Sequence, residues 1–219
     1  MFHVKPSDSE QSTAPPAPPE AQGVFSDALP IAAAYAELLA TEGIVRGLIG
    51  PREVPRLWDR HLLNCAVVTD AIEAGLSVCD IGSGAGLPGL VMAMRRPDLQ
   101  VTLVEPLLRR TTFLDEAVAS LGLENVQVVR ARAEELHGKA AYDVVTSRAV
   151  APLDRLSTWS LPLVRTGGQF LAMKGSSAED ELVAAKSIIA KHHGVVQDVL
   201  ELGTEVLDRP VRVVRILKQ

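Results

Sequence analysis

The sequence predicts a doubly wound α/β sheet with an N-terminal helical extension, and three observations support this. A short apolar run at 77–81 leads into a loop with four glycines between positions 82 and 89. A second apolar run ends at Glu105, 19 residues after Gly86. Further apolar runs alternate with helix-like segments toward the C-terminus, as expected for parallel strands that are buried on both faces.

The expected elements follow the chain in a regular order. Helices at 31–39, 43–49 and 54–70 form the extension, and strands follow at 77–81, 101–105, 126–129, 144–146 and 169–173. Helices at 90–95, 107–121, 133–136 and 153–164 lie between them, and Gly122 closes the second. A capping box, Ser176-Ser177-Ala178-Glu179, opens a helix to about His192 that buries Leu182, Ala185 and Ile189. Strands at 195–200 and 211–217 are expected to finish the sheet as a hairpin-like pair at one edge.

Composition suggests one domain with a tail. The 219 residues are 47% hydrophobic, which is enough for one buried core. Residues 1–23 are rich in proline and are expected to be a disordered tail, followed by a helical cap at 24–76 and a cofactor-binding core at 77–219. The tail lacks the apolar stretch of a signal peptide. The stretch 28–40 contains Pro30 and Glu37 and is too short to span a bilayer, so no membrane association is expected.

Charge and cysteine content narrow the class further. The net charge of −5 argues against a protein that coats nucleic acid without specificity, although a local basic face remains compatible with it. Cys65 and Cys79 form no close-spaced motif, so neither a disulfide scaffold nor a zinc site is expected, and a cytoplasmic location fits. His192-His193 is interpreted as a helix end, so no metal is expected.

The glycine loop carries the chemical signal. Its second half, Gly84 to Gly89, fits the dinucleotide pattern G-x-G-x-x-G, which is weak alone, and Pro88 suits the first helical position. Asp80 stands two residues before the first glycine, and the longer acid-x-Gly-x-Gly-x-Gly pattern resembles motif I of class I S-adenosylmethionine-dependent methyltransferases, which have a Rossmann-like sheet. A carboxylate there suits the ammonium of the methionine moiety, directly or through water, whereas a diphosphate prefers bare N–H groups. Glu105 is placed to accept hydrogen bonds from ribose, the alternative being a cap on the helix near Leu107.

A longer set of segments resembles the bacterial 16S ribosomal RNA guanine-N7 methyltransferases, the family also called glucose-inhibited division protein B. The resemblance rests on 80–89 with its Leu-Pro-Gly ending, Arg132-Ala133-Glu134, Ser147 to Leu153, Met173-Lys174-Gly175, Arg60-His61 and Arg209 to Lys218. It covers about 56 to the C-terminus. Asn64-Cys65 and Leu48-Ile49-Gly50 depart from the family pattern, which bears on substrate contacts in the extension.

The glycine motif and the resemblance together imply an S-adenosyl-L-methionine site. Its expected residues are Asp80, Gly82, Ser83, Gly84, Gly86, Leu87, Glu105, Ala133, Glu134 and Arg148. On spacing alone, Glu134 is explained equally well as a first-turn glutamate stabilised by the helix dipole, and the resemblance favours the cofactor role. Arg148 is also the expected catalytic residue, because it follows a strand end and a guanidinium can hold the methionine carboxylate or a substrate phosphate with two hydrogen bonds. The alternative for Arg148 is a solvated surface arginine.

The resemblance also implies the substrate, guanine 527 in the 530 loop of 16S ribosomal RNA, presented by the small ribosomal subunit or its precursor to a monomeric enzyme. The expected RNA-binding residues are Arg60, His61, Lys174 and Arg209, together with Arg148, each of which alone is more often a solvated charge. Guanine N7 has a free lone pair and needs no general base, so positioning carries most of the rate.

Three alternatives remain open from the sequence. A small-molecule methyltransferase with the same fold would have an aromatic-rich N-terminal lid, whereas this chain is 4% aromatic. A nicotinamide-dependent dehydrogenase is disfavoured by Asp80. A non-catalytic RNA-binding assembly factor would have lost residues from the acid and glycine pattern, and this chain keeps them all.

Overall fold

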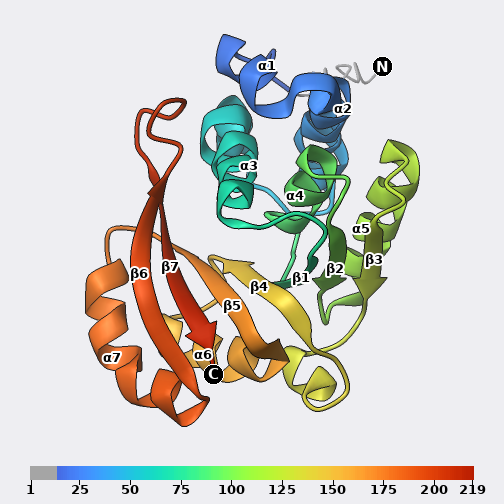
Figure 1. The fold of residues 1–219 in the computed structure, drawn as a ribbon. Coiled ribbons are helices and arrows are strands. Elements are labelled where there is room, and N and C mark those ends of the chain that lie inside the picture. Colours follow the sequence, from blue (N-terminus) through green and yellow to red (C-terminus); the bar gives the residue numbers. More distant parts are fainter. Residues whose placement is uncertain (1–13) are drawn as a thin grey trace, which may run out of the picture.

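A mixed sheet of seven strands forms the centre of the fold (Figure 1). In the computed structural model, which describes residues 14–219, the strands lie in the order β3-β2-β1-β4-β5-β7-β6. Their bounds are β1 (Ser77–Ile81), β2 (Gln100–Val104), β3 (Val126–Val129), β4 (Tyr142–Arg148), β5 (Val164–Lys174), β6 (Gly194–Leu202) and β7 (Val211–Lys218). Strands β1 to β5 pair in parallel, and β7 is antiparallel to both β5 and β6. The predicted doubly wound sheet and its C-terminal hairpin are confirmed.

The order of the strands reverses between β1 and β4, and this reversal positions the site. The chain moves outward from β1 through β2 to β3 and then returns to pair β4 with the other side of β1. In open α/β sheets, ligands bind at the carboxyl ends of the strands beside such a reversal. The glycine loop follows β1 and Arg148 is the last residue of β4, so both lie at this point.

Helices cover both faces of the sheet, because alternate strand residues point to opposite sides. Val78 and Val144 belong to the apolar layer beneath α4 (Gly89–Arg95), α5 (Leu108–Leu121) and the N-terminal helices. Cys79 and Val145 belong to the layer beneath α6 (Leu153–Ser160) and α7 (Ala178–Lys191). Figure 1 shows the N-terminal helices and α7 on opposite sides of the molecule. The helices after β1 are α4 (Gly89–Arg95), α5 (Leu108–Leu121), η6 (Ala133–Leu136), α6 (Leu153–Ser160), η7 (Leu161–Leu163) and α7 (Ala178–Lys191).

The N-terminal extension is helical, as predicted, but its segmentation differs. Its elements are α1 (Pro19–Phe25), η1 (Ser26–Ala28), α2 (Leu29–Leu38), η2 (Leu39–Gly43), η3 (Pro51–Arg56), η4 (Leu57–Leu63), α3 (Asn64–Ala66) and η5 (Val67–Ala71). The prediction of a separate helix at 43–49 is wrong. Helical turns that continue α2 end at Val45, and Gly47 then adopts a left-handed φ of 64°, which ends a helix.

The predicted tail is too long. Residues 1–13 lie outside the described residues, but 14–23 do not form a loose tail. Helix α1 begins at Pro19, and Ala21 is fully buried. The segment before α1 is held by two hydrogen bonds, from the indole Nε1 of Trp58 to the carbonyl of Pro15 (2.9 Å) and from the amide of Ala14 to Glu37 (3.0 Å). Proline content alone did not reveal these long-range partners.

The helical run that contains α2 is also longer than predicted. From Pro19 to Gly43 it is long and apolar enough, by length and composition, to cross a membrane. One face of the run packs inside the protein: Ala32, Tyr35 and Leu39 are fully buried in the core cluster that also contains strand residues of the sheet. This face of the run therefore belongs to the protein core.

Other helix boundaries differ from the predicted ones because of local contacts. The capping box is not formed as predicted, because α7 begins at Ala178 and the hydroxyl of Ser177 donates to Glu181 instead of accepting a hydrogen bond from a helix amide. Helix α4 begins one residue after Pro88. The predicted helix at 153–164 ends in a short 3-10 turn, and Val164 already belongs to β5. Gly122 closes α5 in the left-handed conformation, as predicted.

Candidate functional site

The glycine loop is folded tightly over the end of β1. Gly82, Gly84 and Gly86 all adopt left-handed φ angles, of 70°, 58° and 96°. A Cβ at Gly82 would lie 2.7 Å from the side chain of Val150, and one at Gly86 would lie 2.3 Å from Leu90. At Gly82 and Gly86, glycine is therefore required both by the backbone conformation and by the lack of space for a Cβ.

Asp80 lies beneath this loop. It is fully buried, and its Oδ2 accepts a hydrogen bond from the amide of Gly89 at 3.0 Å, at the start of α4. Its Oδ1 has no hydrogen-bond partner within residues 14–219. Burial raises the pKa of this carboxyl to about 7. A buried oxygen without a partner is costly, and a bound ammonium is the kind of group that satisfies it.

Glu105 follows β2 and holds two backbone segments. Its carboxylate accepts hydrogen bonds from the amides of Gly84 (3.0 Å) and Leu107 (3.1 Å), and Arg110 lies 3.4 Å from Oε2. The side chain is almost completely buried. The alternative role as a cap before α5 is thus present in the structure. The ribose-binding role stays a prediction.

A cavity of about 760 Å³ opens beside the loop, a size suited to a nucleoside ligand. Six of the ten residues expected at the cofactor line it: Gly82, Ser83, Gly84, Leu87, Glu105 and Arg148. Asp80 and Gly86 support the loop from below. Ala133 is buried in the apolar layer beneath α6 and α7, and Glu134 is exposed on η6. Neither lines this cavity, so their adenine contacts stay predictions.

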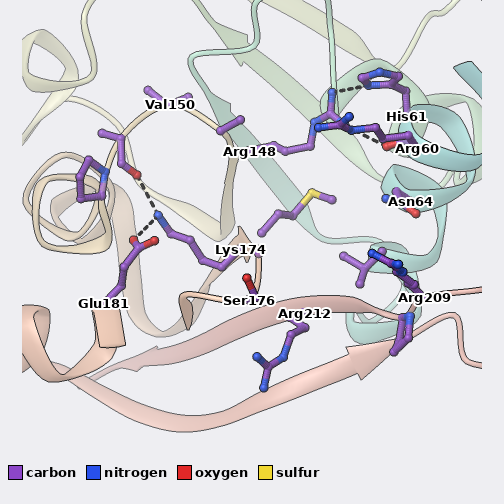
Figure 2. Close-up of a pocket in the computed structure, with 17 residues that line it drawn as sticks. Arg60, His61, Asn64, Arg148, Val150, Lys174, Ser176, Glu181, Arg209 and Arg212 are labelled. Atoms are coloured by element: carbon purple, nitrogen blue, oxygen red, sulfur yellow. Dashed lines mark hydrogen bonds and ion pairs between the residues drawn. The ribbon is translucent and has the colours of Figure 1, made fainter. Parts of the chain in front are cut away.

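A second cavity, of about 920 Å³, is drawn in Figure 2, and it shares Arg60, His61 and Arg148 with the first. All five residues expected at the RNA line it: Arg60, His61, Arg148, Lys174 and Arg209. Arg212 of β7 also lines it, and its guanidinium pairs with Glu179 and Glu201. The sequence-predicted substrate residues, which come from η4, β5 and the β6–β7 hairpin, are thus brought together in one place.

Lys174 is engaged within the protein. Its Nζ donates to the carbonyl of Ala151 at 2.8 Å and pairs with Glu181 at 2.7 Å (Figure 2). Glu181 also accepts a hydrogen bond from the amide of Leu153 at 2.8 Å. These contacts hold the loop after β4 against α7. The position of Lys174 therefore favours a role in shaping this loop.

Arg148 belongs to the walls of both cavities. Its Nη1 donates to the carbonyl of Arg60 at 3.3 Å, and its Nη2 lies 2.9 Å from Nδ1 of His61. Among residues 14–219 it forms no ion pair with a carboxylate. Its positive charge is therefore available to an anionic group at the junction of the two cavities.

Glu53 completes this junction and was not identified from the sequence. Its Oε2 lies 2.8 Å from Nε2 of His61, and its Oε1 lies 3.5 Å from Arg60. The hydrogen bond to His61 lowers the pKa of Glu53, and burial together with the charge of Arg148 lowers the pKa of His61. Tyr35 was also missed: its hydroxyl donates to the carbonyl of Ala85 at 2.6 Å. No local pattern distinguishes these residues from ordinary helical positions.

Metal and thiol chemistry find no support in this part of the fold. Within residues 14–219, no group of three or more His, Cys, Asp or Glu side chains is arranged to hold a metal ion. Cys65 and Cys79 are both buried as free thiols. Burial raises the pKa of Cys65 to about 11 and that of Cys79 well above its usual range, so both thiols are protonated and unsuited to nucleophilic attack.

Comparisons with known proteins agree on one family. The model of the family described as rRNA small subunit methyltransferase G matches residues 29–211. A ribosomal RNA small subunit methyltransferase G of Streptomyces avermitilis is 56% identical over 95% of this chain and 88% of its own length. Proteins of the same name are 54% identical in Thermobifida fusca, over 98% of this chain and 86% of that protein, and 53% identical in Corynebacterium glutamicum, over 92% of each.

Solved structures share the fold at low identity. A ribosomal protein L11 methylase of Lactobacillus delbrueckii subsp. bulgaricus has a TM-score of 0.55 at 15% identity, over 72% of this chain and 77% of that one. Fibrillarin of Aeropyrum pernix, with natively bound S-adenosyl-L-methionine, has a TM-score of 0.53 at 16% identity, over 72% and 75%. These similarities support the methyltransferase type of sheet.

Proposed function

Because the chain belongs to the rRNA small subunit methyltransferase G family, we propose that it transfers a methyl group from S-adenosyl-L-methionine to N7 of a guanine in 16S ribosomal RNA. The observation that carries this proposal is the position of Arg148, shared by the cavity beside the glycine loop and by the cavity lined with basic residues. A reaction that transfers a methyl group from a nucleoside cofactor to a polyanion needs two adjoining sites of this kind.

The residues around the first cavity fit the cofactor. In our proposal the unpartnered Oδ1 of Asp80 receives the ammonium of its methionine moiety. The backbone of the glycine loop lines the cavity where a Cβ at Gly82 would collide with Val150. Glu105 lines the same cavity, and in this proposal it accepts hydrogen bonds from the ribose hydroxyls. When bound, S-adenosyl-L-methionine supplies the methyl group as a sulfonium substituent.

The second cavity fits an RNA substrate. Arg60 and Arg209 line its wall, and guanidinium groups bind phosphate with paired hydrogen bonds. Fixing the phosphates orients the nucleotide, which is the main requirement when the acceptor nitrogen already has a free lone pair. The charge of Arg148, which no carboxylate among residues 14–219 pairs with, lies where the two ligands would meet. This favours a polyanionic substrate over a small neutral molecule.

The partner in this proposal is the small ribosomal subunit or its precursor, and the protein acts as a monomer. One experiment tests the function: mass-spectrometric mapping of N7-methylguanine in 16S ribosomal RNA from cells with and without the gene. We expect one N7-methylguanine, in the 530 loop, to disappear and to return on complementation. If every N7-methylguanine persists, the ribosomal RNA substrate is wrong, and a small-molecule acceptor or a non-catalytic role gains support.

A further inference from the structure

Three side chains from three separate elements form a continuous chain of contacts at the junction of the two cavities. Glu53 comes from η3, His61 from η4 and Arg148 from the end of β4. The distances are 2.8 Å from Glu53 Oε2 to His61 Nε2 and 2.9 Å from His61 Nδ1 to Arg148 Nη2. Figure 2 shows the guanidinium of Arg148 directed at the imidazole of His61. The histidine therefore connects the helical extension to the sheet.

The proton positions in this chain follow from the chemistry of its ends. A guanidinium donates hydrogen bonds and accepts none, so Nδ1 of His61 must be the acceptor. The ring proton then lies on Nε2, which faces the carboxylate of Glu53. Burial and the charge of Arg148 lower the pKa of His61, whereas Glu53 raises it, and the net effect keeps the ring neutral near pH 7. Both ring nitrogens are thus satisfied in one tautomer.

We infer that Glu53 and His61 act as positioning residues, which fix the orientation of Arg148 toward the two ligands. This inference rests on the function proposed above. His61 is mostly buried, and both its ring nitrogens already have partners, so it has little capacity left for RNA. The prediction that His61 binds RNA directly is replaced here by an indirect role. Arg148 is held by His61 Nδ1 and by the carbonyl of Arg60, and its remaining N–H groups are left for ligands.

Glu53 strengthens the preference for the Nε2–H tautomer that Arg148 already favours. Its carboxylate accepts the Nε2 proton and at the same time lies near Arg60 on the wall of the second cavity. Without an acceptor at this position, the Nε2–H group loses its partner, and only the hydrogen bond from Arg148 to Nδ1 still favours this tautomer. The other tautomer would point an N–H group at the N–H of Arg148, and the guanidinium would be displaced from the junction.

Two substitutions at His61 separate positioning from RNA contact. His61→Asn places an amide oxygen near the position of Nδ1 and so keeps an acceptor for Arg148. His61→Gln reaches toward the position of Nε2 and leaves no group at Nδ1. We expect kcat within about threefold of the unsubstituted protein for His61→Asn and at least about tenfold lower for His61→Gln, with KM for RNA little changed in both. Equal losses in the two variants, or a change confined to KM for RNA, would overturn the inference.

A matched pair at Glu53 tests the tautomer. Glu53→Gln keeps an oxygen that can accept the Nε2 proton and is expected to retain most of kcat, whereas Glu53→Ala should resemble His61→Gln. Nitrogen-15 NMR of the full, ligand-free protein reports the tautomer directly, with the His61 signal assigned from its absence in His61→Asn. We expect the neutral Nε2–H form near pH 7, and a population of the other tautomer in Glu53→Ala.

The spectroscopic result is independent of turnover. A protonated ring near pH 7, or a proton on Nδ1, removes the acceptor on which Arg148 depends and refutes the inference whatever the activity. A correct tautomer combined with no methyl transfer to RNA by the unsubstituted protein would instead reject the proposed function. The two failures are therefore distinguishable.

Discussion

The hydroxyl of Tyr35 donates a hydrogen bond to the carbonyl of Ala85 at 2.6 Å, and this contact joins helix α2 of the N-terminal extension to the centre of the glycine loop. Tyr35 is fully buried, and burial raises the pKa of its phenol well above the usual range, so the hydroxyl keeps its proton. The position of a Cβ at Gly86 would lie 3.1 Å from the same hydroxyl. The extension therefore helps to shape the cavity beside the glycine loop as well as the second cavity.

Tyr35→Phe removes this bond while keeping the ring in the core. We expect cofactor affinity to fall by up to about tenfold, because a neutral hydrogen bond contributes roughly 0.5–1.5 kcal/mol and the loop loses one of its supports. Isothermal titration calorimetry with S-adenosyl-L-methionine measures the change. The control is Tyr142→Phe, which removes a tyrosine hydroxyl at the first residue of β4, at the other end of this strand from Arg148. It should leave cofactor affinity unchanged. An unchanged affinity in Tyr35→Phe would show that the loop holds its shape without α2.

Arg148→Ala is expected to abolish methyl transfer while leaving the fold intact, because the side chain is at the surface of two cavities and is not part of the apolar core. Arg148→Lys keeps the charge but not the paired donors, so it should recover only part of the activity. Arg155→Ala, which removes an exposed arginine from α6, is the matched control. Transfer of labelled methyl to small-subunit RNA gives the rates, and circular dichroism checks the fold. Unchanged turnover in Arg148→Ala would remove this residue from the reaction.

The sequence could predict the sheet and the place of the site because these depend on local patterns. Apolar runs marked the strands, and the acid and glycines marked the loop after β1. Strand lengths were harder to predict from the sequence. Strand β4 begins at Tyr142 and β5 at Val164, outside the apolar runs, because pairing with neighbouring strands extends them. Polar residues at strand ends give no signal of such pairing.

The site was predictable where residues follow strand ends and less so where distant segments meet. Arg148 and Glu105 directly follow or end strands, and both line the expected cavity. Tyr35 contacts a residue fifty positions away, and Glu53 acts through His61 on Arg148, so neither contact has a local signature. Lys174, predicted to bind RNA, lies in the second cavity, but its ion pair with Glu181 could be known only from the packing of α7.

Gly86→Ala should destabilise the protein more than Gly138→Ala. Both glycines have left-handed φ angles, 96° and 72°, so each substitution incurs a backbone cost of about 1–2 kcal/mol. A Cβ at Gly138 meets no atom within 4 Å, whereas one at Gly86 would collide with the buried Leu90. We therefore expect an additional loss of about 1–3 kcal/mol for Gly86→Ala in urea unfolding. Equal losses would mean that Leu90 moves aside at no cost.

Asp80 should make the protein less stable as pH rises. Its folded pKa is about 7 because of burial, well above the 3.8 of an ordinary aspartate, so the folded state keeps a proton that the unfolded chain releases. The cost of ionising the buried carboxyl is therefore absent below about pH 4, grows as pH rises, and is complete above about pH 7. The free-energy cost is a matter of a few kcal/mol at most.

Asp80→Asn removes this cost while keeping an oxygen for the amide of Gly89 and adding a donor at the unpartnered position. We expect a higher Tm than the unsubstituted protein at about pH 8 and a much smaller gain at about pH 5. The same substitution should weaken S-adenosyl-L-methionine binding by at least about tenfold, because a charge-assisted bond to the ammonium is lost. Thermal unfolding at both pH values and calorimetry measure the two effects. A variant that is no more stable at pH 8 would argue against a raised pKa, and full retention of cofactor affinity would place the ammonium elsewhere.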